Sequence, residues 1–159
     1  MDYIWSPWRY AYVTKASPGQ CIFCAKASET NDAENFVVYR GRHSFVLLNI
    51  YPYTTGHLMI APYAHVAALE EMEDEAFVEM AWLMRESTIH LRNVYRPQGL
   101  NVGMNLGECA GAGIAGHVHT HVLPRWVGDS SFMTTVGETR VLPEDLRTTF
   151  EKLAKAFGG

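Results

Sequence analysis

Short apolar runs separated by glycine and proline are the dominant pattern between residues 36 and 63. Residues 36–40 and 44–49 flank the pair Gly41 and Arg42, which is the arrangement of a β-hairpin. A third apolar run, residues 57–63, follows the turn-forming segment 51–56. This pattern predicts three consecutive strands.

From about residue 73 to residue 95 the apolar positions change to helical spacing. Acidic residues occupy the first turn and Arg96-Pro97 follows the last, so the pattern predicts one long amphipathic helix. A second helix is expected to begin at Pro143 and to close the chain. The positions that define the two helices are Phe77, Met80, Ala81, Met84, Thr88 and Leu91 in the first and Leu146, Phe150, Leu153 and Phe157 in the second.

A fourth strand is expected over residues 100–105 and a fifth over residues 116–126, joined by a glycine-rich loop. The order β-β-β-α-β-β-α, with short connections in each group of strands, predicts an α+β fold in which helices cover one side of an antiparallel sheet. A chain of 159 residues fits a single domain, residues 1–159. Within it we expect an N-terminal arm at 1–20, a core at 21–126, and a C-terminal loop and helix at 127–159.

The composition excludes several classes of protein. Hydrophobic residues make up 48% and charged residues 19%, and no apolar run approaches the roughly 20 residues of a membrane span. The net charge is −4 and there is no Lys/Arg cluster, which argues against polymeric nucleic acid as a partner. The N-terminus lacks the features of a secretory signal, so we expect a cytoplasmic location and no membrane partner.

Three of the seven histidines lie at alternate positions in the segment GHVHTHVLPRW, residues 116–126. On a strand, His117, His119 and His121 share one face, because successive side chains alternate between faces. A His-x-His pair can bind one metal ion, but His117 and His121 would lie roughly 13 Å apart along a strand, too far for a common ion. The spacing predicts different tasks for the three imidazoles; the alternative is a polar strand with incidental histidines.

The segment before these histidines, residues 105–116, is rich in glycine. Such a loop can turn its backbone N–H groups toward an oxyanion. It lacks the Lys-Ser/Thr of a Walker loop, and it precedes a strand, whereas a dinucleotide fingerprint precedes a helix. We interpret it as a phosphate cradle, with a flexible loop as the alternative. Its glycines are Gly107, Gly111, Gly113 and Gly116.

Two of the three cysteines form the motif Cys21-x-x-Cys24. In a chain without an export signal, this spacing indicates metal binding or redox chemistry more than a disulfide. A redox role lacks the usual thioredoxin-like context, and a reduced, unliganded pair packed by Ile22 and Phe23 is the other alternative. Cys109 is left over as an ordinary thiol.

These segments resemble the histidine-triad (HIT) family of nucleotide hydrolases and transferases, over about residues 21–126. The opening Trp5-x-Pro7-Trp8-Arg9 and the tail after Pro124 further resemble the branch that contains diadenosine tetraphosphate phosphorylases. The fold implied is a HIT-like five-stranded antiparallel sheet with one long helix and a C-terminal helix. The resemblance rests on Gly56-His57-Leu58-Met59-Ile60-Ala61-Pro62, Asn105-x-Gly107, Ala110-Gly111 and His117-x-His119-x-His121-x-x-Pro124-Arg125.

The resemblance implies that His119 is the nucleophile, whose Nε2 attacks the α-phosphorus of a nucleoside polyphosphate. Imidazole suits this role because it is substantially neutral near pH 7 and forms a labile P–N bond. Its Nδ1–H needs an acceptor, which we expect to be a backbone carbonyl of the glycine loop. His121 is expected near the phosphate bridge, where it would place or protonate the leaving group.

The family pattern also implies residues that bind the substrate. Asn49 matches the position that binds ribose hydroxyls, with a strand-end turn residue as the alternative, and His57 lines the same pocket. Ala112 departs from many of the family's hydrolases, which carry Gln there, and this favours inorganic phosphate over water as the second attacking group. The activity implied is phosphorolysis of diadenosine tetraphosphate to ADP and ATP. Donors to the phosphates are expected from Asn105, Gly111, Ala112 and Gly113.

Many family members also hold a structural zinc ion. The ligands that the resemblance implies here are Cys21, Cys24, His65 and His117, a Cys2His2 set that suits a closed tetrahedral site. Mg²⁺ is a further candidate that would accompany the substrate. Because family members commonly pair through the long helix and the fourth strand, a homodimer is expected.

Other functions stay open. Hydrolysis of dinucleoside polyphosphates, or of nucleoside phosphoramidates of the AMP-lysine type, would use the same covalent intermediate. A metallohydrolase would hold an ion on His119 and His121, but the sequence near them offers no obvious Asp or Glu as a third ligand. A non-catalytic nucleotide-binding module would keep the pocket without turnover, and the presence of His119 and Asn105 argues against it.

Overall fold

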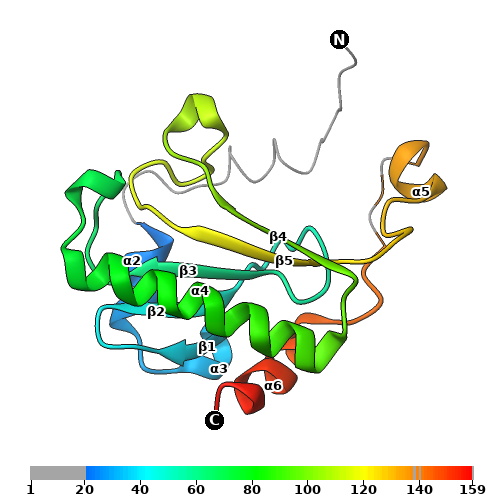
Figure 1. Cartoon of the computed structure of the whole chain (residues 1–159), viewed down its shortest axis with the longest axis horizontal. Helices are drawn as coiled ribbons and strands as arrows, with labels where there is room; N and C mark the ends of the chain where they lie inside the picture. Colours follow the sequence, from blue (N-terminus) through cyan, green and yellow to red (C-terminus); the bar gives the residue numbers. More distant parts are fainter. Residues whose placement is uncertain (1–20, 138, 140, 159) are drawn as a thin grey trace.

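The computed structural model describes residues 21–137, 139 and 141–158, and the proposed N-terminal arm lies outside these residues. The described residues form a five-stranded antiparallel sheet with the strand order β1-β2-β3-β5-β4 (Figure 1). Within the described part, no helix is both long enough and apolar enough to cross a membrane. The strands are β1 (Val37–Arg40), β2 (Ser44–Leu48), β3 (Leu58–Pro62), β4 (Gly99–Met104) and β5 (Thr120–Arg125).

Strand β5 lies between β3 and β4, so the last histidine of the motif sits well inside the sheet. His121 pairs with Met59 of β3 on one side and with Gly103 of β4 on the other. Strand β4 is at the edge of the sheet, where Val102 is 43% exposed. Pairing of this edge with a second copy of the chain stays a prediction.

The two longer helices, α4 (Asp74–Tyr95) and α6 (Leu146–Ala156), pack on one face of the sheet. Helix α4 ends at Tyr95, because the next residue, Arg96, has a left-handed φ of 47° and precedes Pro97, which disfavours helical backbone before it. Helix α6 begins at Leu146, three residues later than the proline predicted as its start, and Asp145 caps it by accepting the Thr148 N–H. The apolar core under these helices includes Val46, Leu48, Ile60, Leu83, Leu91, Val122 and Leu153.

A short helix, α2 (Ile22–Ser28), contacts the opposite face, which corrects the expectation that helices cover only one side. Its Phe23 is fully buried against Phe45 and Met59. With seven residues and one buried apolar side chain, α2 is too short to show helical periodicity in the sequence. The remaining short helices are α3 (Asp32–Asn35), η1 (Leu69–Glu71), η2 (Glu108–Ala110) and α5 (Phe132–Thr135).

The predicted fifth strand is four residues shorter at its start than expected, because β5 begins at Thr120. His117 and His119 therefore precede the strand. The Val118 N–H bonds to the Val66 carbonyl at 2.8 Å, in the segment after β3 has ended, so no regular ladder continues there. The expected alternation still holds, since the rings of His117 and His119 lie 5.1 and 4.8 Å from the Phe23 ring, on the face opposite α4.

Candidate functional site

His119 is held in one tautomer by the backbone of the residue two positions before it. Its side chain is 5% exposed, and its Nδ1 lies 2.8 Å from the His117 carbonyl oxygen. A carbonyl only accepts, so Nδ1 carries the proton and Nε2 keeps its lone pair. The prediction that a carbonyl of the glycine loop holds this ring is wrong: the acceptor is His117, immediately after the loop.

A chain of hydrogen bonds fixes the tautomer of His121 in the opposite sense. The Tyr53 N–H donates to His57 Nδ1 at 3.2 Å, so in neutral His57 the proton is on Nε2. His57 Nε2 lies 2.9 Å from His121 Nδ1 and donates to it. His121 therefore carries its proton on Nε2, where a substrate could accept it.

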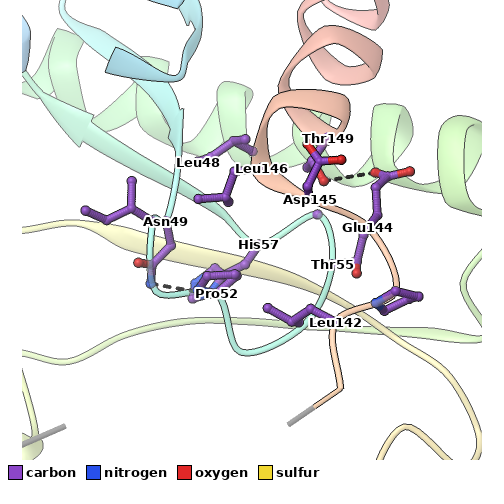
Figure 2. A pocket seen from close by; sticks show the side chains of 13 residues that line it. Leu48, Asn49, Pro52, Thr55, His57, Leu142, Glu144, Asp145, Leu146 and Thr149 are labelled. Carbon is purple, nitrogen blue, oxygen red and sulfur yellow. Dashed lines mark hydrogen bonds between the residues drawn. The ribbon is translucent and has the colours of Figure 1, made fainter. Parts of the chain in front are cut away.

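Asn49 supports this chain from the end of β2. Its Nδ2 lies 3.4 Å from His57 Nδ1, a contact drawn in Figure 2, and its Oδ1 accepts the Tyr51 N–H at 2.9 Å. The second bond is that of a turn residue, which was the alternative interpretation of this position. The amide keeps one N–H and one oxygen lone pair, so a role toward ribose stays a prediction.

Burial keeps both catalytic candidates neutral at physiological pH. Burial lowers the pKa of His119, while the hydrogen bond to the His117 carbonyl opposes this shift. Burial, and then the neighbouring His119, lower the pKa of His121 to about 4. At pH 7 both rings are thus uncharged: His119 offers a lone pair on Nε2, and His121 offers an N–H on Nε2.

We expect the chain to lose stability as the pH falls from about 6.5 to about 4. The unfolded chain protonates His121 near pH 6.5, whereas the folded chain does so only near pH 4, so the unfolded state binds more protons between these values. The free energy of unfolding has its full value above pH 6.5, and burial of His121 lowers it by about 3 kcal/mol by pH 4. Urea unfolding of the parent and of His121→Gln at several pH values measures this pH dependence of the free energy of unfolding.

The same substitution at His90, on α4 and outside this cluster, is the control for that experiment. His90→Gln should retain the pH dependence of the parent, while His121→Gln should reduce it and leave the part that comes from His117 and His119, whose pKa values are also lowered. Equal pH dependence in the parent and His121→Gln would show that burial of His121 does not shift its protonation.

The glycine-rich loop is closed by its own hydrogen bonds. Asn105 Nδ2 donates to the Gly111 carbonyl at 3.4 Å, and Gly111 has a left-handed φ of 91°. The N–H groups of Gly111 and Ala112 bond to the carbonyls of Glu108 and Gly107. Two of the N–H groups expected to bind phosphate are therefore engaged within the loop in this structure, and their role toward a phosphate, like that of the exposed Gly113, stays a prediction.

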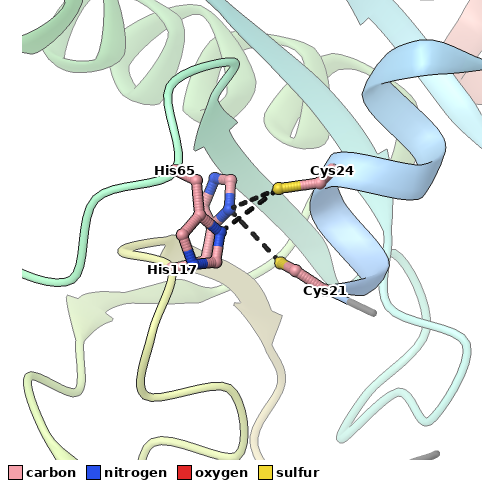
Figure 3. Close-up of side chains that lie close together, drawn as sticks. All are labelled: Cys21, Cys24, His65 and His117. Atoms are coloured by element: carbon pink, nitrogen blue, oxygen red, sulfur yellow. Dashed lines mark hydrogen bonds between the residues drawn. The ribbon is translucent and has the colours of Figure 1, made fainter. Parts of the chain in front are cut away.

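The structure brings together the four side chains named as zinc ligands, as Figure 3 shows. Cys21 and Cys24 come from the start of α2, His65 follows β3, and His117 precedes β5. Cys24 Sγ lies 3.2 Å from His65 Nδ1 and 3.7 Å from His117 Nδ1, and Cys21 Sγ lies 3.4 Å from His117 Nδ1. Donors at tetrahedral positions around zinc would be about 3.6 Å apart.

His117 is oriented for this cluster by a backbone acceptor. Its Nε2 lies 2.9 Å from the Pro62 carbonyl and donates to it, so Nδ1 keeps the lone pair that faces the cysteines. Burial lowers the pKa of His117, which favours the neutral form that a metal needs. The ligand atoms of the four side chains all lie within 4.8 Å of one another, and no other group of three or more His, Cys, Asp or Glu among the described residues is placed to hold a metal ion.

Tyr53 is a site residue that the sequence did not single out. Its ring lies 4.7 Å from the His57 ring and is nearly parallel to that of His121 at 6.1 Å between centroids. In the sequence it is one of two tyrosines in the turn-forming segment 51–56. The only indication in the sequence is that Tyr53 lies four residues before His57, close enough for the two rings to meet across the turn.

Comparison with known proteins places the chain in a family. A model of the HIT domain matches residues 30–127. "AP-4-A phosphorylase" of Mycobacterium tuberculosis (strain ATCC 25618 / H37Rv) is 39% identical over 161 residues, covering 95% of this chain and 82% of that protein. "Protein hit" of Bacillus subtilis (strain 168) is 30% identical over 138 residues, covering 85% of this chain and 92% of that protein.

A solved structure agrees with this assignment. The zinc-bound histidine triad family protein from Mycobacterium smegmatis has a TM-score of 0.70 and 29% identity to this chain, covering 86% of this chain and 92% of that one. The chain belongs to the HIT domain family. Its five-stranded sheet and its two longer helices confirm the α+β fold that the sequence predicts.

Proposed function

We propose that this protein is a nucleotidyl transferase that cleaves diadenosine tetraphosphate by phosphorolysis, giving ADP and ATP. The observation that carries the proposal is the bond from His119 Nδ1–H to the His117 carbonyl, which leaves Nε2 as a neutral nucleophile. The 39% identity to a protein named AP-4-A phosphorylase supports this choice of substrate.

In the first step, His119 Nε2 attacks the α-phosphorus of one end of the substrate. The P–N bond forms, the bond from this phosphorus to the bridging oxygen breaks, and ATP leaves with the electron pair. The ring of the AMP-histidine intermediate becomes positively charged. The His117 carbonyl, which already accepts the Nδ1–H, stabilises that charge.

His121 places the leaving group by a hydrogen bond. Its Nε2–H is directed by the bond from His57 and can be donated to the bridging oxygen. Since its pKa is lowered to about 4, it carries no excess proton near pH 7 to give away. Of the two roles expected for His121, the structure therefore favours placement over protonation.

In the second step, inorganic phosphate attacks the same phosphorus. An oxygen of the phosphate forms the new bond, the P–N bond breaks, and His119 recovers its lone pair as ADP departs. Ala112 and Gly113 place no long polar side chain beside the loop, which leaves room for a phosphate that is larger than water. The net reaction consumes one phosphate for each ADP and ATP formed.

The products formed with and without inorganic phosphate test this proposal. We expect ADP and ATP only when phosphate is present, and ³²P-labelled phosphate should appear as the β-phosphate of ADP. AMP and ATP in equal amounts, independent of phosphate, would instead identify a hydrolase. No cleavage of diadenosine tetraphosphate, together with cleavage of an adenosine phosphoramidate, would identify an enzyme with an amine leaving group.

We also propose that Cys21, Cys24, His65 and His117 hold a structural zinc ion. The donor set, its spacing and the orientation of His117 fit a closed site with four protein ligands. Bound zinc would supply a rigid link between α2 and the backbone of His117, whose carbonyl holds the nucleophile. Mg²⁺ with the substrate and a homodimer stay predictions.

A further inference from the structure

Gly56, the residue before His57, lies in a narrow slot between the end of α4 and strand β5. Its φ is 79°, in the left-handed region that glycine adopts readily. A Cβ added to Gly56 would lie 3.0 Å from Cε2 of Tyr95, 3.2 Å from Cδ2 of Leu91 and 3.3 Å from Cγ of Pro124. Carbon atoms pack best at roughly 3.5–4.0 Å, so these three side chains hold the Gly56 backbone closely.

The Gly56 backbone leads directly into the pair of rings that orients the proton of His121. Residues 54–57 are all buried, and the His57 carbonyl accepts the Asn49 N–H at 3.0 Å. His57 Nε2 donates to His121 Nδ1 at 2.9 Å. Because a hydrogen bond weakens steeply with distance and angle, a shift of Gly56 would weaken the bond that keeps the proton of His121 on Nε2.

Tyr95, one wall of the slot, is held by the segment that leads into α6. Its hydroxyl donates to Glu144 Oε1 at 2.6 Å. Burial, and then this bond, raise the pKa of the Tyr95 hydroxyl, so it stays a donor near neutral pH. The Thr149 hydroxyl donates to the same carboxylate oxygen at 2.9 Å (Figure 2), and Lys152 is paired with the other oxygen. Glu144 thus joins the Tyr95 ring to helix α6.

We propose that Tyr95, held by Glu144, is a positioning residue: it keeps the Gly56 backbone in place and thereby holds His57 at hydrogen-bonding distance from His121. This role rests on the proposed function, which gives His121 the task of placing the leaving group. Tyr95 acts through the backbone of Gly56 and not on the substrate. The end of α4 and the segment before α6 thereby contribute to the geometry of the catalytic histidines.

The bond between the two imidazoles provides a readout that does not depend on activity. In ¹⁵N-labelled protein, the bond from His57 Nε2–H to His121 Nδ1 should give a scalar coupling between the two nitrogens in the NMR spectrum. Tyr95→Leu removes the ring edge against Gly56 and the hydroxyl, so we expect this coupling to disappear. The value of kcat should fall roughly ten- to a hundredfold with KM within about twofold, because misplacement of a positioned group slows the chemical step.

Substitutions at Glu144 change the support of the Tyr95 ring without removing a ring from the core. Glu144→Ala removes the acceptor of the Tyr95 hydroxyl and should weaken the coupling and lower kcat, by a smaller factor than Tyr95→Leu. Glu144→Gln keeps an oxygen that can accept this hydroxyl and should retain the coupling and most of kcat. The pair tests the proposal even if Tyr95→Leu does not fold.

Tyr39→Leu is the matched control for lost packing. Tyr39 lies on β1, at the opposite edge of the sheet from β4, and its ring packs beside Phe157 and Trp82. This variant should lower Tm but retain both the coupling and kcat.

Three results would overturn the positioning role: a parent without the coupling, a Tyr95→Leu variant that keeps the coupling or the parental kcat, or loss of both in Tyr39→Leu as well. If Tyr95→Leu does not fold, a Glu144→Ala variant with the parental coupling and kcat overturns it. Loss of the coupling in Tyr95→Leu and not in Tyr39→Leu, in a protein that shows no phosphorolysis, would retain the positioning role and reject the proposed activity.

Discussion

Replacing His119 with alanine is expected to lower kcat for diadenosine tetraphosphate by roughly four to six orders of magnitude. Loss of a covalent nucleophile has effects of this size in other enzymes, because no other group can form the intermediate. His57 and His121 cannot substitute for His119, since each uses one ring nitrogen in the bond between them and His121 carries a proton on the other. The measurement is a single-turnover reaction with substrate labelled in the adenosine.

The covalent intermediate itself provides a second readout. A reaction quenched in alkaline denaturant, where the P–N bond survives, should yield label on a peptide that contains His119, and the alanine variant should yield none. Because His119 is 5% exposed, alanine leaves a cavity; His119→Asn keeps more of the volume and should be equally inactive. His43→Ala, a histidine substitution in the turn between β1 and β2, should retain activity. Cleavage by the His119 variants at the parent's rate would refute the mechanism.

The hydrophobic pattern predicted those parts of the fold in which burial is strongly periodic. The long helix α4 lies where the pattern predicts it, and of the positions that define the prediction Met80 and Leu91 are buried. Phe77 and Ala81 are exposed instead, and the buried face continues through Leu83 and Ser87. Helix α2 was not predicted, because Phe23 is its one buried residue and a single apolar position shows no periodicity. The start of β5 was misplaced because alternation along the sequence continues through His117 and Val118 although the ladder does not, since Val118 bonds to Val66.

In the candidate site, the sequence predicts the side chains but not the backbone atoms that orient them. The sequence names the imidazoles and thiols, because their types and spacing indicate the chemistry. It does not name the carbonyls of His117 and Pro62 or the N–H of Tyr53, although these atoms set the tautomers of His119, His117 and His57. Every residue has a carbonyl and nearly every one an N–H, so only the folded backbone shows which of them face a ring.

Removal of zinc is expected to destabilise the chain by about 4 kcal/mol, equivalent to a fall in Tm of roughly 10 °C. The proposed ligands come from α2, from the segment after β3 and from the residue before Val118, so an ion on them would join three segments that are distant in sequence. Without it, the thiols and imidazoles keep only weak hydrogen bonds to one another. Metal analysis should give one zinc per chain, and thermal unfolding with and without a chelator measures the effect.

Cys24→Ser should lose zinc and show the lower Tm without chelator, whereas Cys109→Ser, which alters an exposed cysteine in the glycine-rich loop, should keep both zinc and Tm. Since the same backbone that carries His117 holds His119 Nδ1, loss of zinc should also lower kcat more than it raises KM. A protein that contains no zinc after purification in its presence, or one whose Tm a chelator leaves unchanged, would show that these four side chains pack without a metal ion.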